Sequence, residues 1–226
     1  MKTLLRSVFS LLAKLASGLG YIVGRAYTIA WPKLGIYYFE HKYDFLIGPA
    51  WNSWAERGAF GMRVIPEKGK VLDICCGDGF FDNFYYSNRA STVDAFDRDS
   101  SAIQAALKSK PPNISFFVQD ALAFQVSANT YDAIFLFAAI EHFTPEDGHK
   151  LLDSIRSWLK PGGTFLGSTP IFENLGGHND EHQNEFLNEE SLRTFIAPHF
   201  PNLTFYLSKW PNGRQECYFQ ATKESV

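Results

Sequence analysis

From residue 70 onward, short apolar runs alternate with segments in which apolar positions recur every three or four residues. Apolar runs bounded by turn residues predict buried strands, and the longer-period segments predict helices. The predicted strands are 71–75, 92–96, 114–119, 132–137 and 163–168, and the predicted helices are 79–87, 99–108, 145–159 and 189–198. This alternation predicts an α/β fold with a doubly wound, mainly parallel sheet.

The end of the chain breaks this alternation. Two further apolar runs, 203–209 and 215–221, follow each other without a helix between them. Pro211-Asn212-Gly213 lies between the two runs and is typical of a hairpin turn. We therefore expect the last two strands to pair with each other in antiparallel fashion.

The first 24 residues follow a third pattern. At 100° per residue, the apolar side chains of residues 4–23 fall on one half of a helical wheel, and the other half is polar and basic. Lys14 limits the apolar run to seven residues, which is short for a signal peptide and far short of a membrane span. We expect an amphipathic helix that either packs on the domain as a lid or lies on an anionic membrane surface.

Gly18 and Gly20 weaken this helix, and Trp31-Pro32 is expected to end the segment. Residues 35–60 are rich in aromatic side chains and predict one or two short helices over the mouth of the next domain. For any single one of Tyr37, Phe39, Trp51 and Trp54, however, a core position is the favoured interpretation. The predicted organisation is an N-terminal amphipathic extension (1–34), an aromatic helical cap (35–68) and a single α/β domain (69–226).

Composition and charge narrow the function. Of the 226 residues, 46% are hydrophobic, which is enough for a proper core, and the net charge is −3. Residues 1–39 carry five basic and no acidic side chains, so the remainder carries −8 and is a poor candidate for binding nucleic acid. Cys75 and Cys76 are adjacent and the third cysteine is distant, so no disulfide framework is predicted. We expect a cytoplasmic protein, peripheral on the membrane if its N-terminal helix binds there.

Candidate chemistry lies at the strand ends, because parallel sheets bind ligands beyond the carboxyl ends of their strands. The turn 75–79 follows the first strand, and its glycines allow close approach of the backbone to a ligand, although such a turn alone is a weak signal. Asp97 ends the second strand at a distance that suits both hydroxyls of a ribose, with a helix N-cap as the alternative role. Asp120-Ala121 follows the third strand and suits an adenine edge.

These motifs resemble those of class I S-adenosylmethionine-dependent methyltransferases. The matching segments, which lie within residues 70–170, are Asp73-Ile74-Cys75-Cys76-Gly77-Asp78-Gly79, Asp97, Asp120-Ala121, Tyr131-Asp132-Ala133-Ile134 with Ile140-Glu141-His142-Phe143, and Leu159-Lys160-Pro161-Gly162-Gly163. The resemblance implies a seven-stranded sheet with a reversed C-terminal hairpin and S-adenosyl-L-methionine as cofactor. It implies cofactor contacts at Asp73, Cys75, Gly77, Gly79, Asp97, Arg98, Asp120, Ala121 and Phe137.

One position departs from the family. Cys75 replaces the first glycine of the family's loop, and a thiol fits there if the backbone is not left-handed. Glycine is retained at positions 77 and 79, where the cofactor should approach most closely. We therefore expect cofactor binding to survive this replacement.

Methyl transfer to an alcohol or phenol requires alignment, exclusion of water and a proton acceptor. The candidates are Glu141 and His142 after the fourth strand and His178 and His182 in the loop 169–187; His142 is equally suited to a structural role beside the cofactor. A divalent site built from His178, Asp180, His182 and Glu185 is conceivable from spacing, but a solvated polar loop is the simpler interpretation. No metal ligand is assigned.

We expect methyl transfer to an oxygen of a small or lipid- or glycan-linked acceptor. The alternatives are a non-catalytic interaction module that binds S-adenosylmethionine and a protein methyltransferase. Phe137-Ala138-Ala139-Ile140 stands where enzymes that methylate base amino groups carry an N-P-P-Y-like tetrapeptide, so that activity is disfavoured. The sequence does not identify the acceptor.

Overall fold

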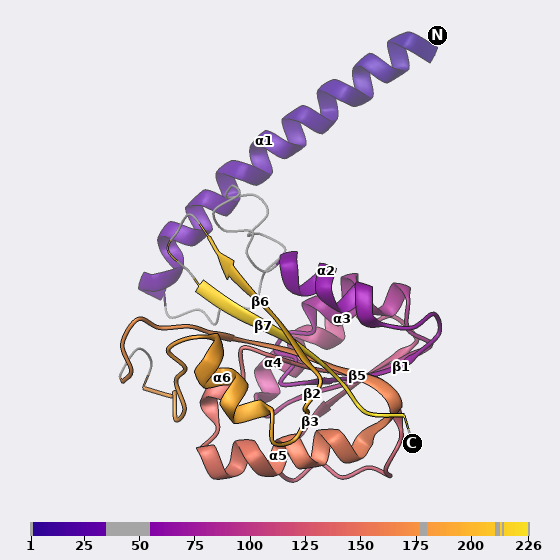
Figure 1. The fold of residues 1–226 in the computed structure, drawn as a ribbon. Coiled ribbons are helices and arrows are strands. Elements are labelled where there is room, and N and C mark those ends of the chain that lie inside the picture. Colours follow the sequence, from indigo (N-terminus) through magenta and orange to yellow (C-terminus); the bar gives the residue numbers. More distant parts are fainter. Residues whose placement is uncertain (1, 35–54, 177–179, 211–212, 214, 226) are drawn as a thin grey trace. The chain divides into compact units, whose positions relative to one another are not determined.

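The computed structural model describes residues 2–34, 55–176, 180–210, 213 and 215–225 (Figure 1). The chain divides into two compact units, residues 1–54 and 55–226. The division falls inside the predicted aromatic cap, and residues 35–54 of that cap lie outside the described residues. Its remainder contains helix α2 (Ala55–Val64), which belongs to the second unit.

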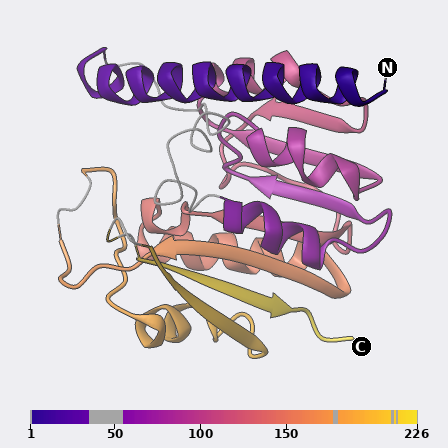
Figure 2. The ribbon, with the colours of Figure 1, turned by 90° about the horizontal axis from the view of Figure 1, so that it is seen from above.

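The second unit contains a seven-stranded sheet in the order β3-β2-β1-β4-β5-β7-β6. The strands are β1 (Lys70–Ile74), β2 (Thr92–Asp97), β3 (Ile114–Val118), β4 (Tyr131–Phe137), β5 (Leu159–Pro170), β6 (Leu203–Lys209) and β7 (Gln215–Thr222). The first five run parallel, whereas β7 is antiparallel to both β5 and β6. Figure 2 shows the yellow arrow of β7 running opposite to the orange arrow of β5. The predicted fold class, with its reversed C-terminal hairpin, is confirmed.

The helices form where the sequence carries start and stop signals. They are α3 (Phe80–Phe84), which is followed by a 3-10 turn at Tyr86–Asn88, α4 (Ser100–Ala106), α5 (Pro145–Trp158) and α6 (Glu189–Ile196). In α5, the Thr144 hydroxyl accepts a hydrogen bond from the Asp147 amide at 3.1 Å. In α6, Asn188 and Ser191 form a reciprocal capping box. Both helices bury an apolar stripe in the core.

The segment before β5 differs from its prediction. Leu159-Lys160-Pro161-Gly162-Gly163 was expected to be a turn, but β5 already begins at Leu159. Tyr131 pairs with Leu159 and Ala133 pairs with Thr164, so the β5 side of the ladder contains extra residues between these two pairs. The glycines make this possible, since Gly162 adopts a φ of 75°. The predicted turn is therefore a bulge within the strand.

The N-terminal unit contains one continuous helix, α1 (Lys2–Leu34). Gly18 and Gly20 do not interrupt it, because a glycine inside a helix costs only about 1 kcal/mol relative to alanine. Pro32 falls in the last turn, two residues before the helix end, where a missing N–H removes a single hydrogen bond.

Apolar side chains of α1 are exposed along the helix, from Leu5 to Val23. This 19-residue stretch has a mean hydropathy of 1.2 and is long and apolar enough to cross a membrane, by length and composition only. The expectation that Lys14 leaves the apolar segment far too short to span a membrane is therefore wrong on that criterion.

The arrangement of the sheet unit decides where a ligand can bind. Helices α2 and α3 lie on one face of the sheet, and α5 and α6 lie on the other (Figure 1). The chain proceeds from β1 outward through β2 and β3, and then returns to place β4 on the other side of β1. The topological switch point lies between β1 and β4, and ligands of open α/β sheets bind beyond the carboxyl ends of the strands at such a point.

Candidate active site

The turn after β1 has the backbone conformation of a ligand-binding loop. Gly77 and Gly79 adopt left-handed φ values of 57° and 63°. A side chain at Gly79 would also collide with the Phe116 ring, whose nearest carbon lies 2.5 Å from an added Cβ. Local geometry therefore requires glycine at position 79 and favours it at position 77, whatever the ligand.

Cys75 is also left-handed, with a φ of 58°. The condition under which a thiol was expected to fit without strain is therefore not met. A non-glycine residue in this region costs of order 1–3 kcal/mol and persists only where the surrounding structure enforces it. Cys75 packs against the hydrophobic core, and that contact offsets part of the cost.

Asp97 joins this turn to the end of β2. Its Oδ2 accepts a hydrogen bond from the Gly77 amide at 2.9 Å, and its Oδ1 accepts one from the Asp99 amide at 2.9 Å. The alternative role of Asp97 as a helix N-cap is wrong, because the N-cap of α4 is Asp99, which accepts from the Ser101 amide. Asp97 thus lies beside the glycine turn, where the ribose-binding prediction requires it.

The other predicted cofactor residues lie at neighbouring strand ends. Asp120 is exposed after β3, and its carboxylate accepts from the Leu122 amide at 2.8 Å. Ala121 is buried, and Phe137 is buried at the end of β4. The pKa of the Cys75 thiol is raised, first by burial and then by the charges of nearby acids, with Arg98 opposing them. Asp73, Asp97 and Asp120 are the acids concerned. Four of the predicted cofactor residues, Asp73, Asp97, Arg98 and Asp120, are therefore close enough to this turn to act on the Cys75 thiol.

A buried pair of carboxyl groups lies beneath the turn. Asp73 on β1 is 4% exposed, and Asp82 on α3 is fully buried. Neither oxygen of Asp82 has a well-formed hydrogen bond within the described residues. A proton retained on one of the two carboxyl groups would let that group donate a hydrogen bond to the other. Burial raises the pKa of Asp73 to about 7 and that of Asp82 well above its usual value. Sequence analysis missed Asp82, which has the spacing of an ordinary first-turn acid.

A second cluster follows β4 and lies on the other side of the switch point. Ala138 has a φ of 44°, a strained value for a residue with a side chain, and its amide donates to the Ser168 carbonyl at 2.8 Å. The chain then forms a 3-10 turn at Ile140–His142. The Glu141 carbonyl accepts hydrogen bonds from the Gln183 and Asn184 amides, which hold the loop after β5 against this turn.

The loop contact brings three of the four predicted catalytic residues together. Ligand-capable atoms of Glu141, His142 and His182 all lie within 4.8 Å of one another. The two imidazole rings meet edge to face, with centroids 5.0 Å apart. The fourth, His178, lies outside the described residues. Asp180, which spacing suggested as a metal ligand, is exposed and is not part of this group.

Each member of the cluster has a supporting contact. The Thr169 hydroxyl donates to Glu141 Oε2 at 3.0 Å. His142 Nδ1 lies 3.3 Å from the Glu181 carbonyl oxygen, and His182 Nδ1 lies 3.1 Å from Glu185 Oε1. Burial raises the pKa of Glu141 to about 7, and burial with the neighbouring His182 lowers the pKa of His142. A neutral imidazole next to a carboxyl that titrates near neutrality is suited to proton transfer.

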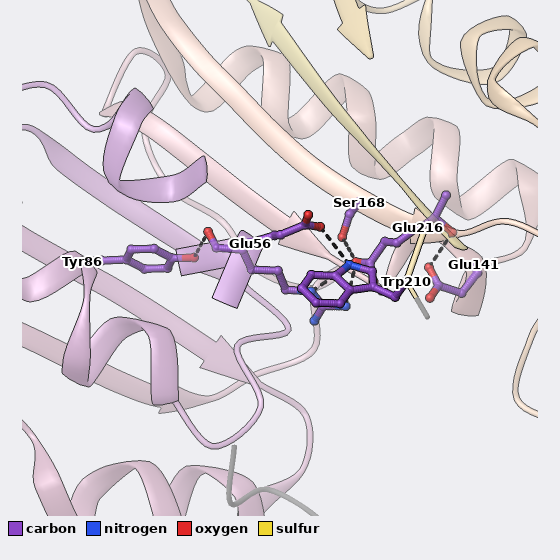
Figure 3. A network of polar contacts seen from close by, with 8 residues as sticks. Glu56, Tyr86, Glu141, Ser168, Trp210 and Glu216 are labelled. Atoms are coloured by element: carbon purple, nitrogen blue, oxygen red, sulfur yellow. Dashed lines mark hydrogen bonds and ion pairs between the residues drawn. The ribbon is translucent and has the colours of Figure 1, made fainter. Parts of the chain in front are cut away.

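Figure 3 shows a buried polar network beside this cluster. Arg57 on α2 binds Glu216 on β7 at 2.8 Å, and both side chains are nearly inaccessible to solvent. Glu216 also accepts a hydrogen bond from the Ser168 hydroxyl. Burial by itself lowers the pKa of the Arg57 guanidinium. The surrounding negative charges, that of Glu216 first, raise this pKa by more, so that it is raised overall. The sequence around Arg57 and Glu216 carries no signal for this pairing, because each has a charged or polar residue directly before it, as exposed charges commonly do.

Comparison with known proteins supports the nucleoside-binding interpretation. Residues 71–163 match the model of a family described as a methyltransferase domain. A malonyl-[acyl-carrier protein] O-methyltransferase from Halalkalibacterium halodurans is 32% identical over 109 residues, which are 46% of this chain and 40% of that protein. A phosphoethanolamine N-methyltransferase from Plasmodium falciparum is 28% identical over 130 residues, 55% of this chain and 49% of that protein.

The chain thus spans less than half the length of these two relatives in the matched segments. Among solved structures, phosphoethanolamine N-methyltransferase 2 from Haemonchus contortus in complex with S-adenosyl-L-methionine has the same fold, with a TM-score of 0.62 at 18% identity. The match covers 76% of this chain and 53% of that one.

Proposed function

We propose that this chain, whose residues 71–163 match a methyltransferase domain, is a class I S-adenosylmethionine-dependent methyltransferase. In this proposal it transfers the methyl group to an oxygen of a small or lipid- or glycan-linked acceptor. The observation that carries this proposal is that two polar clusters follow the neighbouring strands β1 and β4, one on each side of the switch point. One is the turn 75–79 with Asp97, and the other is Glu141, His142 and His182.

The residues of the first cluster fit the cofactor. S-adenosylmethionine supplies a methyl group on a positively charged sulfonium, with a nucleoside on one side and an amino acid on the other. Asp97 and Asp120 provide carboxylates at adjacent strand ends, and the left-handed Gly77 and Gly79 leave two positions of the turn without a side chain. A site with more acidic than basic groups suits a cationic ligand. Asp73 is buried on β1, two residues before the turn, and we assign it the role of orienting the turn.

The residues of the second cluster suit the acceptor. A hydroxyl oxygen that attacks the methyl carbon must lose its proton, while the carbon–sulfur bond breaks and its electron pair stays on sulfur. Glu141, His142 and His182 are the groups near the switch point that can take up this proton. His142 is our first candidate for the base, because its lowered pKa keeps the imidazole neutral and able to accept a proton near pH 7.

The acceptor is proposed from this chemistry and not from the relatives, whose acceptors differ between oxygen and nitrogen. An oxygen acceptor requires a base, and a cluster of two imidazoles and a carboxyl offers one. A protein substrate and a role as a non-catalytic cofactor-binding module are the competing proposals. They are distinguished by the product, since the module yields no methylated compound and the protein methyltransferase yields a labelled protein.

The first test measures cofactor binding. S-adenosylmethionine at a hundredfold excess over its Kd should raise the melting temperature of the purified chain by about 5–10 °C. Asp97→Ala should remove most of this shift, and Asp97→Asn should keep the fold with weaker ribose contacts. Methyl-labelled cofactor is then supplied with phenolic, sugar and prenyl acceptors, and the product is identified by mass spectrometry. If the wild-type chain gives no thermal shift at millimolar cofactor, the proposal fails.

We further propose that α1 lies on an anionic membrane surface through residues 1–24. The support is its exposed apolar side chains, together with Lys2, Arg6 and Lys14 and the absence of acidic residues in this segment. Full-length protein should co-sediment with vesicles containing phosphatidylserine, and a variant lacking residues 1–24 should remain in solution. Binding that resists a sodium carbonate wash indicates a spanning helix instead, and full-length protein that never binds contradicts any membrane role.

A further inference from the structure

We propose that Glu141, His142 and His182 bind a divalent transition-metal ion, with zinc as the best match. The three side chains come from two segments, the 3-10 turn after β4 and the loop after β5. Their ligand-capable atoms lie within 4.8 Å of one another. Ligand atoms at about 2.1 Å from a shared ion lie roughly 3–4 Å from one another. Small rotations of the three side chains would therefore bring their ligand atoms to the distances that an ion requires.

The surroundings of the two imidazoles are those of metal ligands. A metal-binding histidine almost always uses one ring nitrogen for the metal and the other for a hydrogen bond to a carboxylate or a carbonyl oxygen. His182 Nδ1 faces Glu185 Oε1, and His142 Nδ1 faces the Glu181 carbonyl. In both rings the Nδ1 atom is therefore engaged with an oxygen, which leaves Nε2 for an ion.

The carboxylate ligand is supported in the same manner. Glu141 is 2% exposed, and Thr169 donates to its Oε2 at 3.0 Å. Glu185 is held in turn by the Gly176 amide at 2.6 Å from its Oε2. The cluster thus has a fixed inner set of ligands and an outer set of partners, which a solvated loop lacks. Together, the Glu141 and Glu185 carboxylates balance the charge of a divalent ion.

The identity of the ligands selects the metal. Two imidazoles and one carboxylate favour zinc and other first-row transition metals over magnesium, which prefers oxygen ligands. Three protein ligands also leave a coordination position open, as in catalytic zinc sites. This set differs from the one that spacing suggested, since Asp180 is exposed and Glu185 lies behind His182 as its hydrogen-bond partner.

The role of the ion rests on the proposed function. An ion held by Glu141, His142 and His182 would lower the pKa of a hydroxyl group bound at its open position. In the metal-loaded protein the two imidazoles would then serve as ligands, and the proton of the acceptor would pass to water instead of to His142. The oxygen then attacks the methyl carbon as described above. This mechanism specifies the acceptor as a small hydroxyl compound, such as a phenol or sugar, that coordinates the metal through oxygen.

The test uses the full chain after removal of metals with a chelator. Zinc is titrated by calorimetry, and cobalt is titrated by its visible absorption, which becomes intense when the ion is tetrahedral or five-coordinate with nitrogen ligands. We expect one ion per chain in the wild type. His142→Gln and His182→Gln should each weaken zinc binding by roughly 100-fold or more, and Glu185→Gln by about 10–100-fold. Asp180→Asn is the matched control and should leave the affinity unchanged.

Two outcomes overturn the inference: a wild type without saturable zinc or cobalt binding, and binding that neither histidine variant weakens. A larger loss in Asp180→Asn than in His182→Gln also overturns it, in favour of the set suggested by spacing. Circular dichroism and the thermal shift with S-adenosylmethionine are recorded on every variant. If the chain binds the cofactor but no metal, only the metal-site inference is contradicted. If it binds metal but no cofactor, the proposed function is contradicted and the metal site is retained.

Discussion

The two halves of the sheet's carboxyl edge hold their polar groups in different ways. On the β1–β2–β3 half, backbone amides fix the carboxylate of Asp97, which accepts from the Gly77 and Asp99 amides. On the β4–β5–β7 half, side chains from distant segments fix them, as Arg57 does for Glu216. The first arrangement requires the pairing of β1 with its neighbour β2, whereas the second joins α2 to β7 and exists only when the far part of the sheet has also formed.

This difference predicts how well each half of the sheet edge tolerates amino-acid substitutions. A carboxylate held by backbone amides tolerates many changes elsewhere, because amides are present whatever the side chains are. A carboxylate held by a buried cation is lost if either partner changes. We therefore expect the β1–β2–β3 half, the cofactor half in our proposal, to tolerate more substitutions around its carboxylates than the β4–β5–β7 half, the proposed acceptor half.

The largest expected effect tests the dependence on Arg57. Arg57→Met leaves Glu216 buried without its cation, and breaking a buried ion pair from one side costs about 3–5 kcal/mol. Ser168 still donates to Glu216, so the loss should fall at the lower end of that range. Urea unfolding at pH 7, followed by circular dichroism, measures the change in the free energy of unfolding.

The matched change on the other half is Asp120→Asn. Its exposed carboxylate accepts from the Leu122 amide, and an asparagine oxygen can do the same, so the cost should stay below about 1 kcal/mol. The double variant Arg57→Met with Glu216→Gln should recover part of the loss, since no uncompensated charge remains. If Arg57→Met lowers the free energy of unfolding by no more than Asp120→Asn does, the proposed contrast between the two halves is wrong.

The same contrast explains what the sequence could predict. All seven strands and the reversed hairpin were predicted, because strand periodicity and turn residues are local signals. Asp97 was predicted from its spacing to the turn, and the structure places it there. Neither Arg57 nor Asp82 was identified, because a buried charge has the same local sequence context as an exposed one until its partner is known. The pairing of Glu141 with His182 likewise depends on a loop contact.

A second prediction concerns the pH dependence of stability on the acceptor half. Burial raises the pKa of Glu141 from 4.5 to about 7, so between these values the folded protein keeps a proton that the unfolded chain has lost. Stability from this group is complete below about pH 4.5 and is lost as the pH rises through 7. Glu141→Gln mimics the protonated form and should become more stabilising relative to wild type as the pH rises from about 5 to 8. Urea unfolding of chelator-treated protein across this range measures the trend.

Glu67→Gln, on the exposed turn before β1, is the control for a charge change without burial. It should give the same difference from wild type at every pH. Asp73→Asn extends the test to the cofactor half, where burial also raises a carboxyl pKa to about 7. A Glu141→Gln effect that does not change between these pH values contradicts the assignment of a buried, proton-binding carboxyl.

The smallest expected effect compares one strained residue from each half. Cys75 and Ala138 have φ values of 58° and 44°, which glycine adopts at little cost. Ala138→Gly should stabilise the fold by about 0.5–1 kcal/mol. Cys75→Gly should gain less, because it also removes a thiol that packs against the core, and it should leave S-adenosylmethionine binding intact.

The two substitutions also show whether backbone strain at each position is needed for ligand binding or has no effect on it. If the turn after β1 needs only its left-handed backbone, then Cys75→Gly keeps the cofactor affinity, because glycine adopts the same φ. The Ala138 amide bonds to Ser168, and that bond fixes where the chain places Glu141 and His142. Freeing this position should loosen the cluster and weaken zinc binding while stability rises. Chemical unfolding paired with zinc and cofactor titrations on both variants checks this, and equal responses at the two positions would mean that strain plays the same part in both halves.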